Sequence, residues 1–214
     1  DYAGRRELER IKTDFALNQV YGIEIHDILA RICKINLLLH HDGHTNIEGD
    51  KSCLDTEFTK ERLKLGKENF NVVVGNPPFG DTIKEGDEDQ LGKSSLEDFE
   101  VSAGRSQIPS EHIIVEKSIK MLKDDGLLGL VLPDGVFNNQ GELSNCPLLR
   151  NYLVKQGRVL AVVSLPDYAF RKSGAQNKTS ILFFKKFNYD QRTAFENAYD
   201  AQIANGASDE QAII

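Results

Sequence analysis

Apolar residues along the chain occur in two kinds of pattern, continuous runs and helical spacing. The continuous runs predict strands, which lie at 20–25, 70–75, 127–133, 159–166 and 179–187. A further brief strand is expected within 45–54. Spacing of three and four residues predicts helices, at 4–18, 28–41, 110–126 and 146–156, with more helix from 190 onward.

The order of these elements indicates an α/β fold with a mostly parallel sheet, because strands alternate with helices. The uninterrupted β-branched run at 70–75 predicts a central strand of that sheet. Helix 28–41 is expected to be well buried, since its apolar positions cover most of its circumference. Segments 159–166 and 179–187 are expected to pair as a closing hairpin.

Four residues of chemical interest stand where predicted strands end. Ligands of an open α/β sheet bind in the crevice beyond the carboxyl ends of its strands. Glu24, Asp50, Asn76 and Pro133 all lie at or just beyond such an end. The pattern therefore predicts one line of binding positions along this crevice.

Composition places limits on what this chain of 214 residues does. Its 40% hydrophobic and 28% charged residues are ordinary for a soluble globular protein, and no apolar run is long enough to span a membrane. The chain has three cysteines, which is an odd number, and their spacing is not that of metal ligands. Both observations favour reduced thiols in a cytoplasm. HHDGH at 40–44 is the only metal candidate, and it is interpreted as a polar loop, so no metal site is expected.

The net charge of −7 argues against a self-sufficient DNA-binding module. Any surface that binds DNA would therefore be local or lie elsewhere.

Residues 80–108 differ from their surroundings. They are polar, contain Gly and Ser, and show no periodicity. A segment of this length and composition predicts a long flexible loop. We expect this loop to become ordered only when DNA is bound.

The stretch FNVVVGNPPFGD at 70–81 carries the clearest chemistry. Proline fixes its own φ and has no N–H, so Pro77 and Pro78 hold Asn76 extended and leave mainly acceptors at the strand's tip. The Asn76 side-chain oxygen and the Pro77 carbonyl suit a substrate nitrogen that carries two N–H donors, meaning a primary amine or amide. Phe79 offers a flat face to a planar group. The plainer alternative is a rigid turn followed by a core phenylalanine.

This stretch resembles the signature of the adenine-specific, amino-group DNA methyltransferases. The resemblance covers about residues 20–187 and follows the order of motifs in modification (M) subunits of type I restriction–modification systems. Its further motifs are YGIEIHDILARICKINLLLH, GDKSCLD, SEHIIVEKSIKMLKDDGLLGLVLPDGVF and VLAVVSLPDYAFRKSGAQNKTSILFFKK. The resemblance implies a doubly wound, Rossmann-like methyltransferase fold, with a catalytic domain at 1–188 and a C-terminal helical tail at 189–214.

The resemblance also implies S-adenosyl-L-methionine as cofactor and a role for matching residues. Glu24 would accept hydrogen bonds from the ribose hydroxyls of the cofactor, and Ile25 would pack on its ring. Asp50 would lie near the cofactor's adenine, although Asp55 is a neighbour of the same type.

On the substrate side, the resemblance implies that Asn76 and Pro77 hold the target amino group. Phe79 would stack on an adenine flipped out of the duplex, as an enzyme acting on a base requires, and Pro78 would also contact the substrate. Phe170 is a candidate second wall of the pocket or, equally, a core residue of the hairpin.

The chain departs from the family pattern at the first cofactor motif. It has no acidic-Pro-x-Cys-Gly-x-Gly type loop, and the strand before that loop, central in the sheet, is missing as well. We therefore expect a truncated domain that is inactive by itself. Pairing with another copy would be one way to cover its exposed strand edges.

The reaction implied is direct methyl transfer to adenine in cytoplasmic DNA, with a specificity (S) subunit and a restriction (R) subunit as partners and no membrane association. Two alternatives remain open at this point. One is a protein methyltransferase that acts on glutamine amides through Asn-Pro-Pro-Tyr. The other is a non-catalytic scaffold that keeps the fold.

Overall fold

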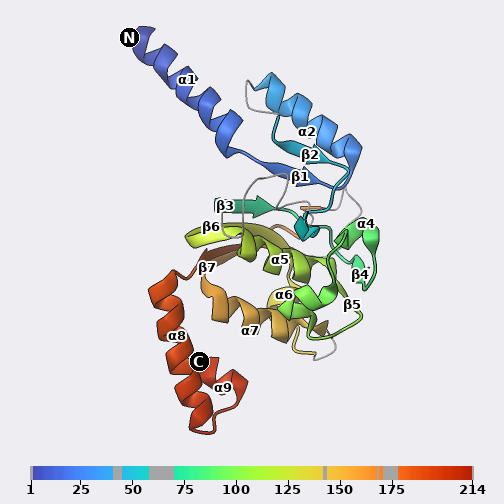
Figure 1. Ribbon diagram of the computed structural model, residues 1–214, viewed down its shortest axis with the longest axis vertical. Coiled ribbons are helices and arrows are strands. Elements are labelled where there is room, and N and C mark those ends of the chain that lie inside the picture. The colour runs from blue at the N-terminus through green and yellow to red at the C-terminus, as the bar shows by residue number, and fades with distance from the viewer. Residues whose placement is uncertain are drawn as a thin grey trace.

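The computed structural model describes residues 2–40, 45–57, 70–141, 144–167, 169, 170 and 178–213. Helices and strands alternate along them (Figure 1), in agreement with the predicted α/β class. The helices are α1 (Tyr2–Gln19), α2 (Asp27–Leu39), α4 (Glu88–Leu91), α5 (Ser110–Met121), α6 (Gly135–Asn138), α7 (Cys146–Gln156), α8 (Tyr189–Ala204) and α9 (Asp209–Ile213), with the short 3-10 helices η1 (Leu96–Asp98) and η2 (Glu100–Ser102). The strands are β1 (Gly22–Glu24), β2 (Ile47–Gly49), β3 (Phe70–Gly75), β4 (Thr82–Lys84), β5 (Gln107–Pro109), β6 (Leu122–Pro133), β7 (Gly157–Ser164) and β8 (Thr179–Lys186).

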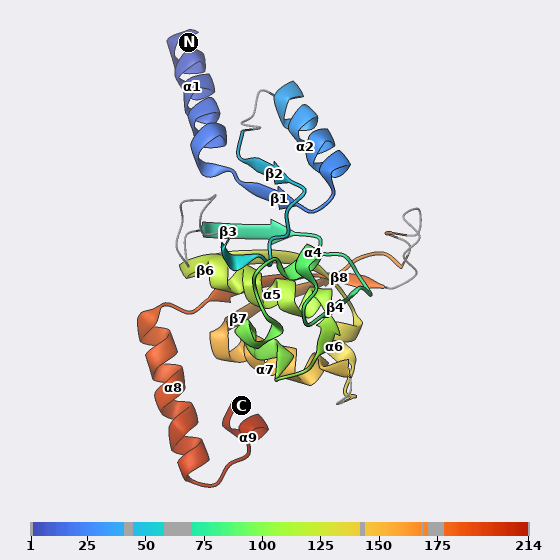
Figure 2. The ribbon, with the colours of Figure 1, turned by 45° about the vertical axis from the view of Figure 1, so that its right-hand side comes forward.

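The strands form three sheets. The largest has the order β3-β6-β8-β7, in which β3 and β6 are parallel while β8 is antiparallel to both of its neighbours. Three of its four strands therefore point the same way, and β7 and β8 pair as the predicted hairpin. The parallel pair β1-β2 lies on the far side of β3 (Figure 2), and β4 and β5 form a small antiparallel ribbon.

The core lies between the large sheet and helices α5 and α7. Alternate residues of β6, such as Leu128, Leu130 and Leu132, are buried beneath Ile113 and Ile119 of α5 and Leu149 of α7. On the opposite face of the sheet, Val72, Val74, Leu127 and Phe183 remain between 40% and 77% exposed. Among the described residues, helices thus cover one face of this sheet.

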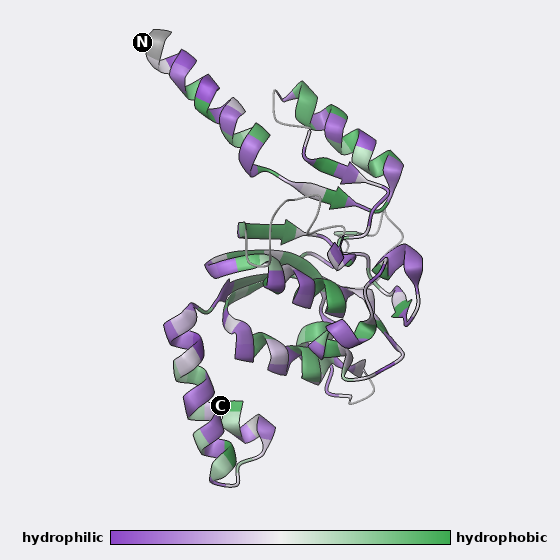
Figure 3. Cartoon of the chain, in the orientation of Figure 1, coloured by the Kyte–Doolittle hydropathy of each residue, from purple (hydrophilic) through white to green (hydrophobic). Residues whose placement is uncertain are grey.

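Two expectations about burial are wrong. Strand β3 was expected to be a buried central strand, but it forms an edge of its sheet, because no described residues pair with its other side. Helix α2 was expected to be well buried, yet only Ala30 is, where α2 meets β2 closely at Gly49. The apolar stripes of α1 and α2 in Figure 3 therefore face solvent along most of their length.

The segment 80–108 also differs from the predicted structureless loop. It contains β4, α4, η1, η2 and β5, and it adds a set of side chains to the core: Ile83, Leu91, Leu96, Phe99, Val101 and Ile108. Each element has only three or four residues, too few for a periodic pattern to show in the sequence. The burial comes from tertiary contacts, among them those of η2 with α5 and α7, and not from local amphipathicity.

The C-terminal residues from 189 onward form α8 and α9, which stand beside α7 (Figures 1 and 2). Lys155 of α7 forms an ion pair with Asp209 of α9 at 2.8 Å. No helix in the described ranges combines the length and the apolar character needed to cross a membrane.

Candidate active site

The Asn-Pro-Pro-Phe loop directly follows β3, as predicted. Pro77 is buried and anchors the loop, whereas Asn76 and Pro78 are exposed and Phe79 is half-buried. Gly75, the last residue of β3, pairs with Leu130 of the parallel strand β6, so the loop emerges at the carboxyl edge of the sheet. An exposed amide on a buried proline support is a suitable arrangement for holding an external donor.

Phe79 and Phe170 come together at this loop. Their ring centroids are 6.0 Å apart and the rings are nearly perpendicular, with an interplanar angle of 80°. Both side chains are half-buried, so each keeps part of its surface available to a ligand. Such edge-to-face pairs are favourable and fix the direction of both rings. Of the two alternatives for Phe170, the contact favours the wall over a hairpin-core residue, and its role remains a prediction.

Glu24, Ile25 and Asp50 lie at the ends of β1 and β2, as predicted. Because β1 and β2 are parallel with Glu24 opposite Gly49, Glu24 and Asp50 leave the same edge of this pair. Asp50 is exposed and has a left-handed backbone with φ 59°, which an aspartate tolerates better than most residues. Ile25 is half-buried beside them.

These residues fit the nucleoside part of a cofactor. Glu24 Oε1 accepts the backbone N–H of His26 at 2.9 Å, which orients the carboxylate. The other oxygen of Glu24 has no partner within the described residues and can accept a hydroxyl donor. Asp55, the alternative to Asp50, is half-buried and packs against Gly92, so its carboxylate has a structural contact.

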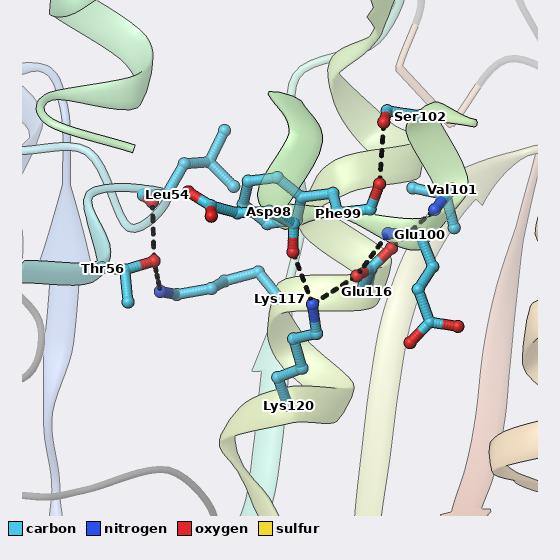
Figure 4. Close-up of polar contacts among 10 residues, drawn as sticks. All are labelled: Leu54, Thr56, Asp98, Phe99, Glu100, Val101, Ser102, Glu116, Lys117 and Lys120. Carbon is cyan, nitrogen blue, oxygen red and sulfur yellow. Dashed lines mark hydrogen bonds and ion pairs between the residues drawn. The ribbon is translucent and has the colours of Figure 1, made fainter. Parts of the chain in front are cut away.

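The segment after β2, up to the helical residue Thr56, is joined to α5 by a buried lysine (Figure 4). Lys117 Nζ donates to Thr56 Oγ1 at 3.0 Å, and Lys117 is only 7% exposed. Burial raises the pKa of the neighbouring Cys53 thiol, while the Lys117 charge lowers it and the Glu24 carboxylate raises it further. The bond from Lys117 to Thr56 thus joins the segment that follows Asp50 to α5.

Sequence reasoning did not single out Lys117, Cys53, Ser110 or Glu111 for this site. Lys117 looks like a solvent-facing residue of an amphipathic helix, and its partner Thr56 is far away in the sequence. Ser110 is the first residue of α5, and the N-cap position before it is occupied by Pro109. The sequence signal for Ser110 and Glu111 is that two polar residues begin the helix that follows the segment 80–108.

No metal site is found among the described residues, where no three His, Cys, Asp or Glu side chains are grouped suitably for an ion. Positions 41–44 of the HHDGH motif lie outside those residues.

The mixed sheet, the acidic residues at the ends of β1 and β2, and the Asn-Pro-Pro-Phe loop after β3 are compatible with an α/β fold of the methyltransferase type. The match to known proteins is more specific. The family of N-6 DNA methylases matches residues 4–211, and the chain belongs to this family.

Two curated relatives are type I restriction enzyme methylase subunits. The EcoEI subunit from Escherichia coli is 27% identical over 168 residues, covering 78% of this chain and 30% of the relative. The MpnII subunit from Mycoplasma pneumoniae is 28% identical over 178 residues, covering 82% of this chain and 32% of the relative. The chain thus spans about a third of the length of these relatives.

Solved structures agree on the fold. The type I restriction enzyme EcoKI M protein superposes with a TM-score of 0.57 at 21% identity, covering 83% of this chain and 33% of that protein. The type I methyltransferase subunit from Streptococcus thermophilus gives the same TM-score and identity over 79% of this chain and 34% of that protein. At this identity the likeness is one of fold.

Proposed function

We propose that this chain is the catalytic part of a modification subunit that methylates the exocyclic amino group of adenine in DNA. The observation that carries the proposal is the Asn76-Pro77-Pro78-Phe79 loop at the carboxyl edge of β3, with Phe170 beside Phe79. Membership of the N-6 DNA methylase family supports the same reaction.

The proposed cofactor is S-adenosyl-L-methionine, which supplies an electrophilic methyl group on sulfonium. Glu24 accepts hydrogen bonds from its ribose hydroxyls, Ile25 packs on its ring, and Asp50 lies beside its adenine. Glu24 is suited to this because the His26 N–H orients its carboxylate and leaves one oxygen available.

On the target side, the Asn76 side-chain oxygen and the Pro77 carbonyl accept the two N–H groups of the adenine amine. Two acceptors outside the plane of the base favour a tetrahedral nitrogen, so its lone pair is no longer delocalised into the ring. Phe79 stacks on the flipped base, with Phe170 and Pro78 on its borders. Most of the rate then comes from orientation and amine activation, with no covalent enzyme intermediate.

Partners follow from the same proposal. The type I relatives favour an assembly with a specificity (S) subunit that reads the DNA sequence and a restriction (R) subunit that cleaves it, in the cytoplasm where the DNA lies. The printed sequence has no Gly-rich cofactor loop, so we propose that these 214 residues alone do not support transfer. Self-association through the edge of β3 that no described residue pairs with is the alternative way of extending the sheet.

The test is to express the full-length protein with its specificity partner in a host that lacks adenine methylation. Methyladenine in the host DNA is then quantified by nucleoside mass spectrometry. Asn76→Ala is expected to abolish it, whereas Asn71→Ala, which changes an exposed asparagine of the preceding strand β3, should not. Absence of methyladenine from an intact complex that binds S-adenosylmethionine would refute the proposal, and methylated protein glutamine would then identify the reaction.

A further inference from the structure

The first residue of α5 contacts the loop that follows Asn76 and Pro77. The backbone N–H of Ser110 donates to the Asp81 carbonyl at 2.9 Å. Its hydroxyl lies 3.3 Å from the Pro78 carbonyl, and the Glu111 carboxylate is also within reach of this single proton. Ser110 is 2% exposed, so these contacts are shielded from water.

Glu111, the next residue of α5, is a second buried contact to the same loop. The side chain is 8% exposed, and burial raises the pKa of this carboxyl group. The backbone N–H of Gly80 lies near its carboxylate and favours the charged form, which lowers the pKa. Glu111 Oε2 is buried and has no hydrogen-bond partner within the described residues. A buried acceptor left partly unsatisfied is costly, so stability alone is a poor explanation for a glutamate at this position.

These contacts fall where the loop is otherwise free to move. The rings of Pro77 and Pro78 already restrict φ at those two positions. Gly80 has φ +81°, and because glycine has no Cβ the backbone rotates easily at this point. Phe79 stands between the rigid and the free part, so the direction of its ring depends on how residues 79–81 are held.

We infer that Ser110 and Glu111 are positioning residues that hold residues 78–81 so that Phe79 and the Asn76-Pro77 acceptors keep their geometry for methyl transfer. This inference rests on the proposed function. Neither side chain needs to touch the substrate, since each acts through the loop. The proposed cofactor residues Glu24 and Asp50 lie at the ends of β1 and β2, so cofactor binding should not depend on Ser110 and Glu111.

The first test measures kinetics of the full-length protein with its specificity partner. Glu111→Ala is expected to lower kcat about 10- to 100-fold, the size of effect that misplacement by about 1 Å can produce. The KM for S-adenosylmethionine should stay within about twofold, because β1 and β2 are not disturbed. Glu111→Gln keeps an acceptor for Gly80 and should recover most of the rate. Ser118→Ala, a buried serine later in α5, serves as the matched control.

The second test does not depend on activity. Hydrogen–deuterium exchange of a peptide that covers residues 76–84 reports on the amides of Phe79, Gly80 and Asp81. Exchange should be faster in Glu111→Ala than in the wild type, and unchanged in Ser118→Ala.

The outcomes separate this inference from the proposed function. Unchanged exchange in Glu111→Ala would overturn the positioning role whatever the enzyme methylates. Faster exchange in Glu111→Ala with an unchanged kcat would show that holding residues 78–81 in place does not matter for methyl transfer. Loss of kcat for Glu111→Ala together with a matching rise in the cofactor KM or general unfolding would also count against it. If the wild type makes no methyladenine, the proposed function fails and the reaction role falls with it.

Discussion

Glu116, in the middle of α5, provides the sharpest test of how the segment 80–108 is held. Its side chain is fully buried, and its two oxygens accept the backbone N–H groups of Glu100 at 3.0 Å and Val101 at 2.8 Å. Lys120 Nζ lies 2.5 Å from Oε1 and also donates to the Asp98 carbonyl at 2.8 Å (Figure 4). Glu116→Ala leaves both N–H groups without an acceptor, and we expect η1 and η2 to separate from α5.

The magnitude follows from the two hydrogen bonds. A bond to a charged acceptor contributes about 1.5–3 kcal/mol. The ion pair with Lys120 adds less than about 1 kcal/mol, since the lysine side chain is 32% exposed and its charge is partly screened. We therefore expect Glu116→Ala to lower the free energy of unfolding by about 3–6 kcal/mol. Glu116→Gln keeps one acceptor and should lose about half as much.

The assay is urea unfolding of the wild type, Glu116→Ala, Glu116→Gln and Lys120→Ala, followed by circular dichroism. Lys120→Ala is the control, because it removes the ion pair but leaves both backbone bonds to Glu116. Hydrogen exchange at Val101 locates the effect. A loss below about 1 kcal/mol for Glu116→Ala, or one no larger than that of Lys120→Ala, would show that the network does not hold the segment.

Two further predictions concern the cofactor side and pH. Glu24→Ala should raise the Kd for S-adenosylmethionine about 10- to 100-fold, because hydrogen bonds to a carboxylate are lost. Calorimetry on the full-length protein measures this Kd. Asp14→Ala removes an exposed carboxylate of α1 and is the control, and an effect of Glu24→Ala no larger than that of the control would contradict the prediction. Burial lowers the pKa of His112 from 6.5 to about 4, helped by the Arg105 charge. The unfolded chain therefore takes up a proton first as the pH falls below 6.5, so about 2 kcal/mol of stability should be lost between pH 7 and pH 5. His112→Gln should remove that part of the pH dependence in urea unfolding, and an unchanged slope would show that His112 does not cause it.

The sequence predicted those features that local pattern controls. The continuous runs became β3, β6, β7 and β8, and helix α5 begins at Ser110 as expected. The positions of Glu24, Asp50, Asn76 and Pro133 at strand ends are confirmed, because they depend only on where each run stops. The functional roles of Glu24, Asp50 and Asn76 remain predictions.

Burial was predicted less well, because it depends on which surface an element meets. Helix α2 has an apolar circumference, but among the described residues only the β1-β2 pair packs on it, mainly through Ala30. Conversely, Phe99 and Val101 belong to a polar segment yet are buried. The buried backbone N–H of Val101 donates to the Glu116 carboxylate, which lies 15 residues away in the sequence. Contacts at such distances leave no local pattern in a single sequence.

Helix α5 shows why the two sides of the site belong to one rigid unit. Nine of its twelve residues are buried, among them Glu111, Glu116 and Lys117. A helix that only covered a sheet would place such charged residues in solvent, where they carry no desolvation cost. Here each one reaches a different loop: Glu111 the loop after β3, Glu116 the segment at η2, and Lys117 the loop after β2. In-line methyl transfer requires the donor and the amine to be aligned, and these loops would carry them on opposite sides of the proposed reaction. A single helix that contacts both segments would fix their relative position, and this gives the charged side chains inside the core a role in the proposed reaction.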